Sequence, residues 1–222
     1  MRRSWRWAGS TALAAAGLCA ACAWAQAGFD DSASARLLMA ARGNDLPALE
    51  RALADGGSIN ARNRLGETAL VSALKRNQLD MARRLIDAGA DVNLAAINGI
   101  TPLMAAAYAG DADIVSRLLA HDASVDAVDR IDKTALIYAA GEGRADIVRL
   151  LLGKGVDVNR RYANDLTLLM WAAGYGKDDV VKLLIAAGAD PELKDNRGKT
   201  AADIARDGRY VTTGALLAKK SP

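Results

Sequence analysis

The sequence contains few of the side chains on which catalysis and metal binding most often depend. It has one histidine, His121, and only two cysteines, Cys19 and Cys22. A single histidine supplies neither a catalytic triad nor a set of metal ligands. The Gly-Glu-Gly run that ends at Gly143 lacks the Lys-Ser/Thr pair of a phosphate-binding loop. We therefore expect no enzymatic activity, no metal and no cofactor.

Residues 1–27 have the layout of a secretory signal peptide. Arg2, Arg3 and Arg6 form a basic start, and the uncharged stretch 8–21 that follows is too short to span a bilayer comfortably. Small-x-small sites predict cleavage after residue 25 or after residue 27. We expect Sec-type export to a periplasm. Twin-arginine export, a lipidated cysteine, secretion and an uncleaved inner-membrane anchor are the alternatives.

Removal of this segment changes what the composition implies about partners. The formal net charge of the chain is +3, and the three arginines of the segment account for all of it. Both cysteines lie in the segment as well. Residues 28–222 are then near neutral and contain no thiol, so the basic isoelectric point does not predict nucleic-acid binding.

The rest of the chain is periodic, with threonines 33 residues apart that are each followed five positions later by alanine. The series is Thr68, Thr101, Thr134, Thr167 and Thr200, and then Ala73, Ala106, Ala139, Ala172 and Ala205, with Ala40 one interval earlier. Each threonine can cap a short first helix. Glycine or asparagine nine positions after the threonine can end that helix with a positive φ. The alanines then allow close contact between helices.

A 33-residue period of this kind resembles the ankyrin repeat, most clearly at Thr101–Ala106 and Asp146–Leu151. The resemblance covers residues 33–218 and implies an all-α repeat solenoid, with two helices and a β-hairpin finger in each repeat. It divides residues 28–222, a single domain, into an N-terminal capping repeat (33–60), four full repeats (63–95, 96–128, 129–161 and 162–194) and a partial C-terminal capping repeat (195–218).

The resemblance also implies a concave binding groove, formed by the finger tips and the exposed side of the first helices. The expected partner-binding residues are Arg64, Leu65, Ile97, Ile100, Arg130, Ile131, Lys133, Leu166, Arg197 and Lys199 from the fingers, and Tyr108, Trp171 and Tyr175 from the first helices. The apolar finger residues are expected to project without joining a core. Tyr108 and Tyr175 are treated as equivalent exposed anchors, whereas Trp171 either lines the groove or packs between repeats.

These features favour an exported monomer that binds, and protects or regulates, a partner protein with an acidic patch. Binding of nucleic acid is not expected, and contact with a membrane is expected only if the N-terminal segment is retained. A membrane-tethered assembly factor and an immunity-type inhibitor of a toxic enzyme are the alternatives that would use the same surface.

Overall fold

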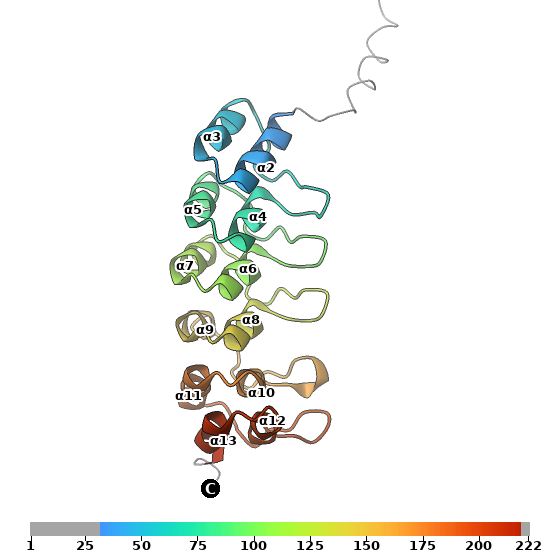
Figure 1. The fold of residues 1–222 in the computed structure, drawn as a ribbon, viewed down its shortest axis with the longest axis vertical. Coiled ribbons are helices and arrows are strands. Elements are labelled where there is room, and N and C mark those ends of the chain that lie inside the picture. Colours follow the sequence, from blue (N-terminus) through green and yellow to red (C-terminus); the bar gives the residue numbers. More distant parts are fainter. Residues whose placement is uncertain (1–31, 219–222) are drawn as a thin grey trace, which may run out of the picture.

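Antiparallel helix pairs stack one after another along the chain (Figure 1). The structure is a computed structural model that describes residues 32–218, so the predicted signal peptide and its cleavage sites lie outside the described residues. The first helices are α2 (Ala33–Gly43), α4 (Ala69–Lys75), α6 (Pro102–Ala109), α8 (Ala135–Glu142), α10 (Leu168–Gly174) and α12 (Ala201–Asp207). The second helices are α3 (Leu46–Ala54), α5 (Leu79–Asp87), α7 (Ala112–Ala120), α9 (Ala145–Leu152), α11 (Asp178–Ala186) and α13 (Val211–Ala218).

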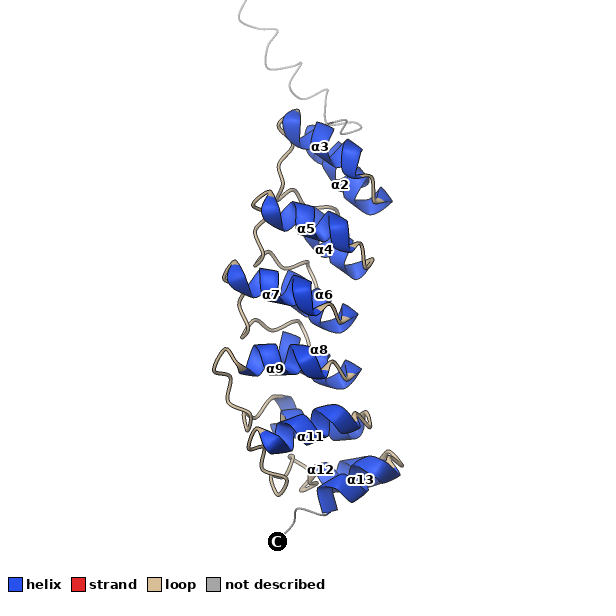
Figure 2. Cartoon of the chain, turned by 90° about the vertical axis from the view of Figure 1, so that its left-hand side faces the viewer, coloured by secondary structure: helices blue, strands red, loops and turns tan. Residues whose placement is uncertain are grey.

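The two sets of helices form two layers. Figure 2 shows the layer of second helices from outside, with α5, α7 and α9 in front of the first helices. Within residues 32–218, no helix is long and apolar enough to cross a membrane.

The first helices begin where the threonine series predicts. Thr68, Thr101, Thr134, Thr167 and Thr200 each accept, at the side-chain oxygen, the backbone N–H three residues later. These caps satisfy donors that a helix N-terminus otherwise leaves unpaired. The predicted turn after the first helix is confirmed too, since Asn44, Asn77, Gly110, Gly143 and Gly176 all have a positive φ.

The alanine series lies in the core of the array. Ala73, Ala106, Ala139, Ala172 and Ala205 are completely buried, as the sequence predicts. A methyl group at this position lets adjacent first helices approach closely, and a larger side chain would have to displace a neighbour. The buried side chains form one continuous core, as expected when each repeat covers the apolar face of the next.

The fingers are five-residue turns and not the β-hairpins that the family resemblance implies. In each finger the N–H of the first residue donates to the C=O of the fifth, which pairs Asn63 with Glu67, Ala96 with Ile100, Asp129 with Lys133, Tyr162 with Leu166, and Asp195 with Lys199. The one strand-like pairing within the described chain is an isolated antiparallel bridge between Arg62 and Thr68. The fingers are therefore held by turn geometry.

Backbone hydrogen bonds also join neighbouring fingers, with one interruption. Ile97 donates to the C=O of Leu65 at 3.0 Å, and equivalent bonds join the second finger to the third and the fourth to the fifth. Across the described residues no such bond joins the third finger (129–133) to the fourth (162–166). The fourth finger contains a short 3-10 turn, η1 (Ala163–Asp165), in which Asn164 and Asp165 are left-handed. Side chains must therefore hold this junction.

Candidate functional site

The finger turns and the first helices form one side of the array, which we call the groove face (Figure 1). Four aromatic side chains gather near its centre: Tyr108 from α6, Tyr138 from α8, Trp171 from the middle of α10, and Tyr175, which caps the C-terminus of α10. The rings of Tyr108 and Tyr138 meet edge to face with centroids 6.2 Å apart. Those of Trp171 and Tyr175 are stacked, with centroids 6.1 Å apart. These four residues are the aromatic cluster.

Tyr108 and Tyr175 occupy neighbouring positions of the repeat, which corrects the sequence analysis. Tyr108 aligns with Gly141 in the next repeat, whereas Tyr175 aligns with Glu142. A Cβ atom built on Gly141 would lie 3.5 Å from the ring of Tyr175. The ring therefore lies against the backbone of α8, at a place where the repeat has no side chain.

Lys133 lies inside the aromatic cluster. Its Nζ atom is 4.7 Å from the ring centroid of Trp171 and 5.7 Å from that of Tyr138, which is cation–π geometry. Within the described chain, no carboxylate approaches this Nζ atom within the 4 Å of an ion pair. Lys133 is therefore held by aromatic rings and has no counter-ion of its own.

The nearby carboxylate of Asp129 is already engaged. Asp129 is 6% exposed, and its side chain accepts the backbone N–H groups of Ile131 and Lys133. The hydroxyl of Tyr138 donates to its other oxygen at 2.6 Å. Burial, together with this hydrogen bond to a carboxylate, raises the pKa of Tyr138 above its usual value. Asp129 thus fixes both the third finger and the ring of Tyr138.

Two adjacent clefts open beside the aromatic cluster. The larger one, of about 460 Å³, lies between α4, α6 and α8 and is lined in part by Ile100 and Tyr108. The smaller one, of about 230 Å³, is lined in part by Lys133, Trp171 and Tyr175. Tyr108, Tyr138 and Glu142 line both clefts, so the two share a wall.

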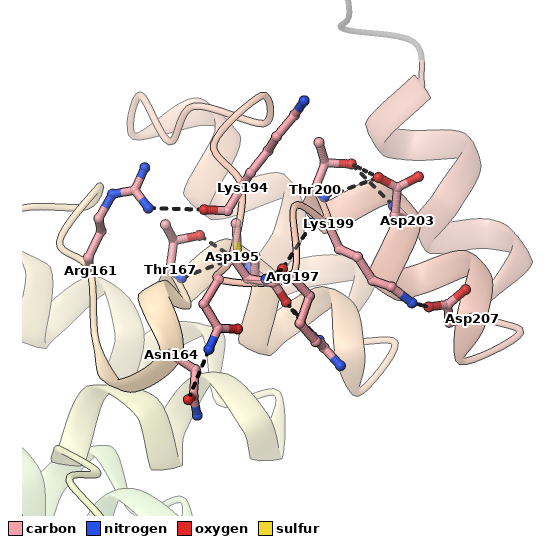
Figure 3. A network of polar contacts seen from close by, with 12 residues as sticks. Arg161, Asn164, Thr167, Lys194, Asp195, Arg197, Lys199, Thr200, Asp203 and Asp207 are labelled. Atoms are coloured by element: carbon pink, nitrogen blue, oxygen red, sulfur yellow. Dashed lines mark hydrogen bonds and ion pairs between the residues drawn. The ribbon is translucent and has the colours of Figure 1, made fainter.

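The cations of the groove face fall into two groups. At the C-terminal end, Arg197 pairs with Asp195 at 2.7 Å and Lys199 pairs with Asp207, so the charges of both are balanced within the chain (Figure 3). At the N-terminal end, Lys75 pairs with Glu67 at 2.6 Å. The group without a carboxylate within 4 Å in residues 32–218 includes Arg64, Arg130, Lys133 and Arg144.

The apolar finger residues also divide into two groups. Leu65, Ile97 and Ile131 project from the finger tips and are more than half exposed. Ile100 and Leu166 are half-buried and pack against the core, so the expectation that they project without joining it is wrong. They stand at the fifth finger position, which lies next to the first helix.

The aromatic anchors differ in exposure. Tyr108 and Tyr175 are 56% and 47% exposed, in agreement with the sequence analysis. Trp171 is half-buried against the core while its ring lines the smaller cleft. Its indole Nε1 is buried and has no acceptor among the described residues. A buried donor of this kind is costly unless water or a bound molecule supplies the acceptor.

Asp129, Gly141 and Arg144 were not among the residues that the sequence indicated for the site. Aligning the repeats shows which residue types occupy each position, but only the structure shows which of them meet. The same alignment places His121 at the C-terminal cap of α7, where it is exposed. Residues 32–218 contain no group of three or more His, Cys, Asp or Glu side chains that could hold a metal ion.

Comparison with known families agrees with this architecture. A family model described as ankyrin repeats in three copies matches residues 89–162, and one described as ankyrin repeats in many copies matches residues 53–103 and 153–205. No curated protein matches the chain in sequence. The two family matches together span residues 53–205, which include the whole aromatic cluster and both clefts. The chain belongs to the ankyrin-repeat family.

Proposed function

We propose that this protein is exported and that it binds a partner protein through the groove face, thereby protecting or regulating it. Ankyrin repeats generally mediate protein–protein interaction, which supports a binding module. The observation that carries the proposal is the aromatic cluster beside two clefts. Exposed tyrosine and tryptophan side chains next to concave surface are the usual energetic centres of protein interfaces.

The charges around the cluster indicate the kind of surface that would fit. Arg64, Arg130, Lys133 and Arg144 lack carboxylate partners within 4 Å in the described part of the chain. Residues 28–222 are near neutral as a whole, so this is a local excess of positive charge. It complements a partner with an acidic patch beside an apolar protrusion. The protein would act as a monomer, with the groove face free to receive that partner.

The binding proposal is tested by identifying the partner and then measuring two variants. The full chain, tagged at its C-terminus, is purified from a periplasmic extract, and co-purifying proteins are identified by mass spectrometry. Tyr175→Ala should weaken binding of the identified partner by about 1–3 kcal/mol, mainly through faster dissociation. Arg149→Ala is the control, because Arg149 lies on α9 in the second layer and pairs only within its helix. Loss of binding in Arg149→Ala but not in Tyr175→Ala would place the interface on the other side.

The export proposal has its own test. N-terminal sequencing of the protein released by osmotic shock should begin at Gln26 or Gly28. A soluble protein that still begins at Met1 would contradict export, whereas an uncleaved chain in the membrane fraction would favour the tethered alternative.

A further inference from the structure

Two positions eight residues apart lie on the groove face of each full repeat and of the last one: the fifth residue of the finger and the end of the first helix. In the first full repeat these positions hold Glu67 and Lys75, which form an ion pair at 2.6 Å. In the last repeat they hold Lys199 and Asp207, which also form an ion pair (Figure 3). In these two repeats the chain therefore neutralises this pair of positions by itself.

The central repeats break this pattern. The second full repeat has Ile100 and Tyr108 in these positions, and both line the larger cleft. The third has Lys133 and Gly141, so its own repeat offers the lysine no counter-ion. The ring of Tyr175 is the group that lies next to Gly141. The fourth has Leu166 and Gly174, neither of which carries a charge. Lys133 is thus the one charged member of the series that the chain does not neutralise within residues 63–207.

We infer that Lys133 takes a carboxylate from the partner, and that the same segment of the partner places a large apolar side chain in the neighbouring cleft beside Tyr108. This inference rests on the proposed function and specifies the occupant of its site. Cation–π contacts at a partly exposed site are weak. They leave the ammonium hydrogens of Lys133 available to a carboxylate, which would complete the kind of ion pair that the first full repeat and the last repeat make internally.

The distance between Lys133 and the cleft beside Tyr108 determines how far apart the acidic and the apolar residue lie in the partner segment. Packed helices lie about 8–10 Å apart, and an extended chain advances about 3.3 Å per residue. The acidic and the apolar residue should therefore be about three positions apart in an extended segment. Glu142 lines both clefts and disfavours a second acid between them, so a single carboxylate at Lys133 fits better than an acidic run.

A peptide selection tests the inference and does not require an identified partner. A random twelve-residue peptide library displayed on phage is selected against the full-length wild-type protein, Lys133→Glu and Lys154→Glu. Lys154 is the matched control, an exposed lysine in the turn after α9. Wild type and Lys154→Glu should enrich peptides with Asp or Glu about three positions from a large apolar residue. Lys133→Glu should enrich Lys or Arg at the same place.

Affinities of one enriched peptide then measure the contribution of the charge. By fluorescence anisotropy, Lys133→Gln should weaken binding about tenfold, Lys133→Glu should weaken it further, and Lys154→Glu should stay within about twofold of wild type. Lys133→Gln removes the charge but keeps much of the side-chain stem. Its affinity therefore remains a valid test even if the new carboxylate near Asp129 unfolds the Lys133→Glu variant.

Three results would overturn the inference: enriched peptides without an acid at a constant spacing, the same peptides selected by Lys133→Glu, or no enrichment at all. The proposed function is judged separately, by the effect of Tyr175→Ala on the protein partner. Peptides that lack an acid but lose binding in Tyr175→Ala would refute the inference and leave the proposed function standing.

Discussion

Replacing Gly176 by alanine should destabilise the array more than the same change at Gly143, although both glycines occupy the same turn of the repeat. Their φ angles are +63° and +77°, in the left-handed region. An L-residue with a Cβ atom costs about 1–2 kcal/mol there. Asn44 and Asn77 fill the same turn in the first two repeats, so the backbone shape does not depend on glycine alone.

The neighbours of the two glycines differ. A Cβ atom on Gly143 would lie 3.1 Å from Cδ of Lys177, a flexible side chain that can move aside. On Gly176 it would lie 2.3 Å from Cδ1 of Tyr210, whose ring also covers Gly208. The ring cannot leave one glycine without losing its contact with the other. We therefore expect a further cost of about 1–2 kcal/mol for Gly176→Ala, within the usual range for overpacking.

Equilibrium unfolding in urea, followed by circular dichroism, measures both changes. The free energy of unfolding should fall by about 1–2 kcal/mol in Gly143→Ala and by about 2–4 kcal/mol in Gly176→Ala. Adding Tyr210→Ala should cost less in the Gly176→Ala background than in wild type, because the ring has already been displaced. Equal losses in the two glycine variants, or strict additivity with Tyr210→Ala, would show that the ring does not constrain this turn.

Two further changes test the core and the acid response. Ala139→Leu should destabilise by about 1–3 kcal/mol through overpacking, whereas Ala186→Leu, on the exposed side of α11, should leave the melting temperature nearly unchanged. Burial alone would raise the pKa of Glu67, but hydrogen bonds from Lys75 and Asn63 outweigh it and lower the pKa. The Glu67 carboxylate therefore stabilises the fold fully above its unfolded pKa of about 4.5, and this contribution is lost as the pH falls through the lower folded value. Glu67→Gln should have a smaller loss of urea midpoint between pH 5 and pH 3 than wild type, and an unchanged acid response would contradict this assignment.

The helical framework could be read from the sequence because its signals are local. A threonine cap, a left-handed glycine and a buried alanine each depend on a few neighbouring residues, and the 33-residue period repeats each signal several times. Because each weak local signal recurs at the same position of several repeats, the boundaries of the helices could be predicted reliably. The finger strands were the exception, since the family resemblance implied them and the residues of this chain form turns instead.

The candidate site was harder to predict because it depends on which side chains meet. The sequence showed Lys133 and Lys199 in the same position of two repeats, but only the structure shows that one lies against aromatic rings and the other pairs with Asp207. Likewise, Ile97 and Ile100 lie three residues apart in one finger, yet one projects and the other packs against the core. A turn of five residues changes the direction of successive side chains in a way that composition does not reveal.

At the junction between the third and fourth repeats, residues of the proposed binding site also help to hold the two repeats together. The ion pair between Arg84 and Glu50 and that between Arg83 and Asp113 join successive second helices near the N-terminus, whereas the ion pairs of α9 and α11 in the described chain lie within each helix. The third and fourth fingers also lack a backbone bond in this part of the structure.

The contact of Lys133 with Trp171 crosses this junction, so it contributes to stacking as well as to the proposed site. A carboxylate that pulled the ammonium away from the indole ring would remove one contact across the junction. A partner that fills the smaller cleft would replace that contact, because this cleft is lined by α8 and α10 together. Binding should therefore stabilise the C-terminal repeats against the rest of the array. Hydrogen exchange in α10 and α11 should slow when the partner binds wild type, and should slow less in Lys133→Gln at equal occupancy. Equal slowing of exchange in both proteins would contradict this prediction, because it would show that Lys133 does not link partner binding to the stacking of the repeats.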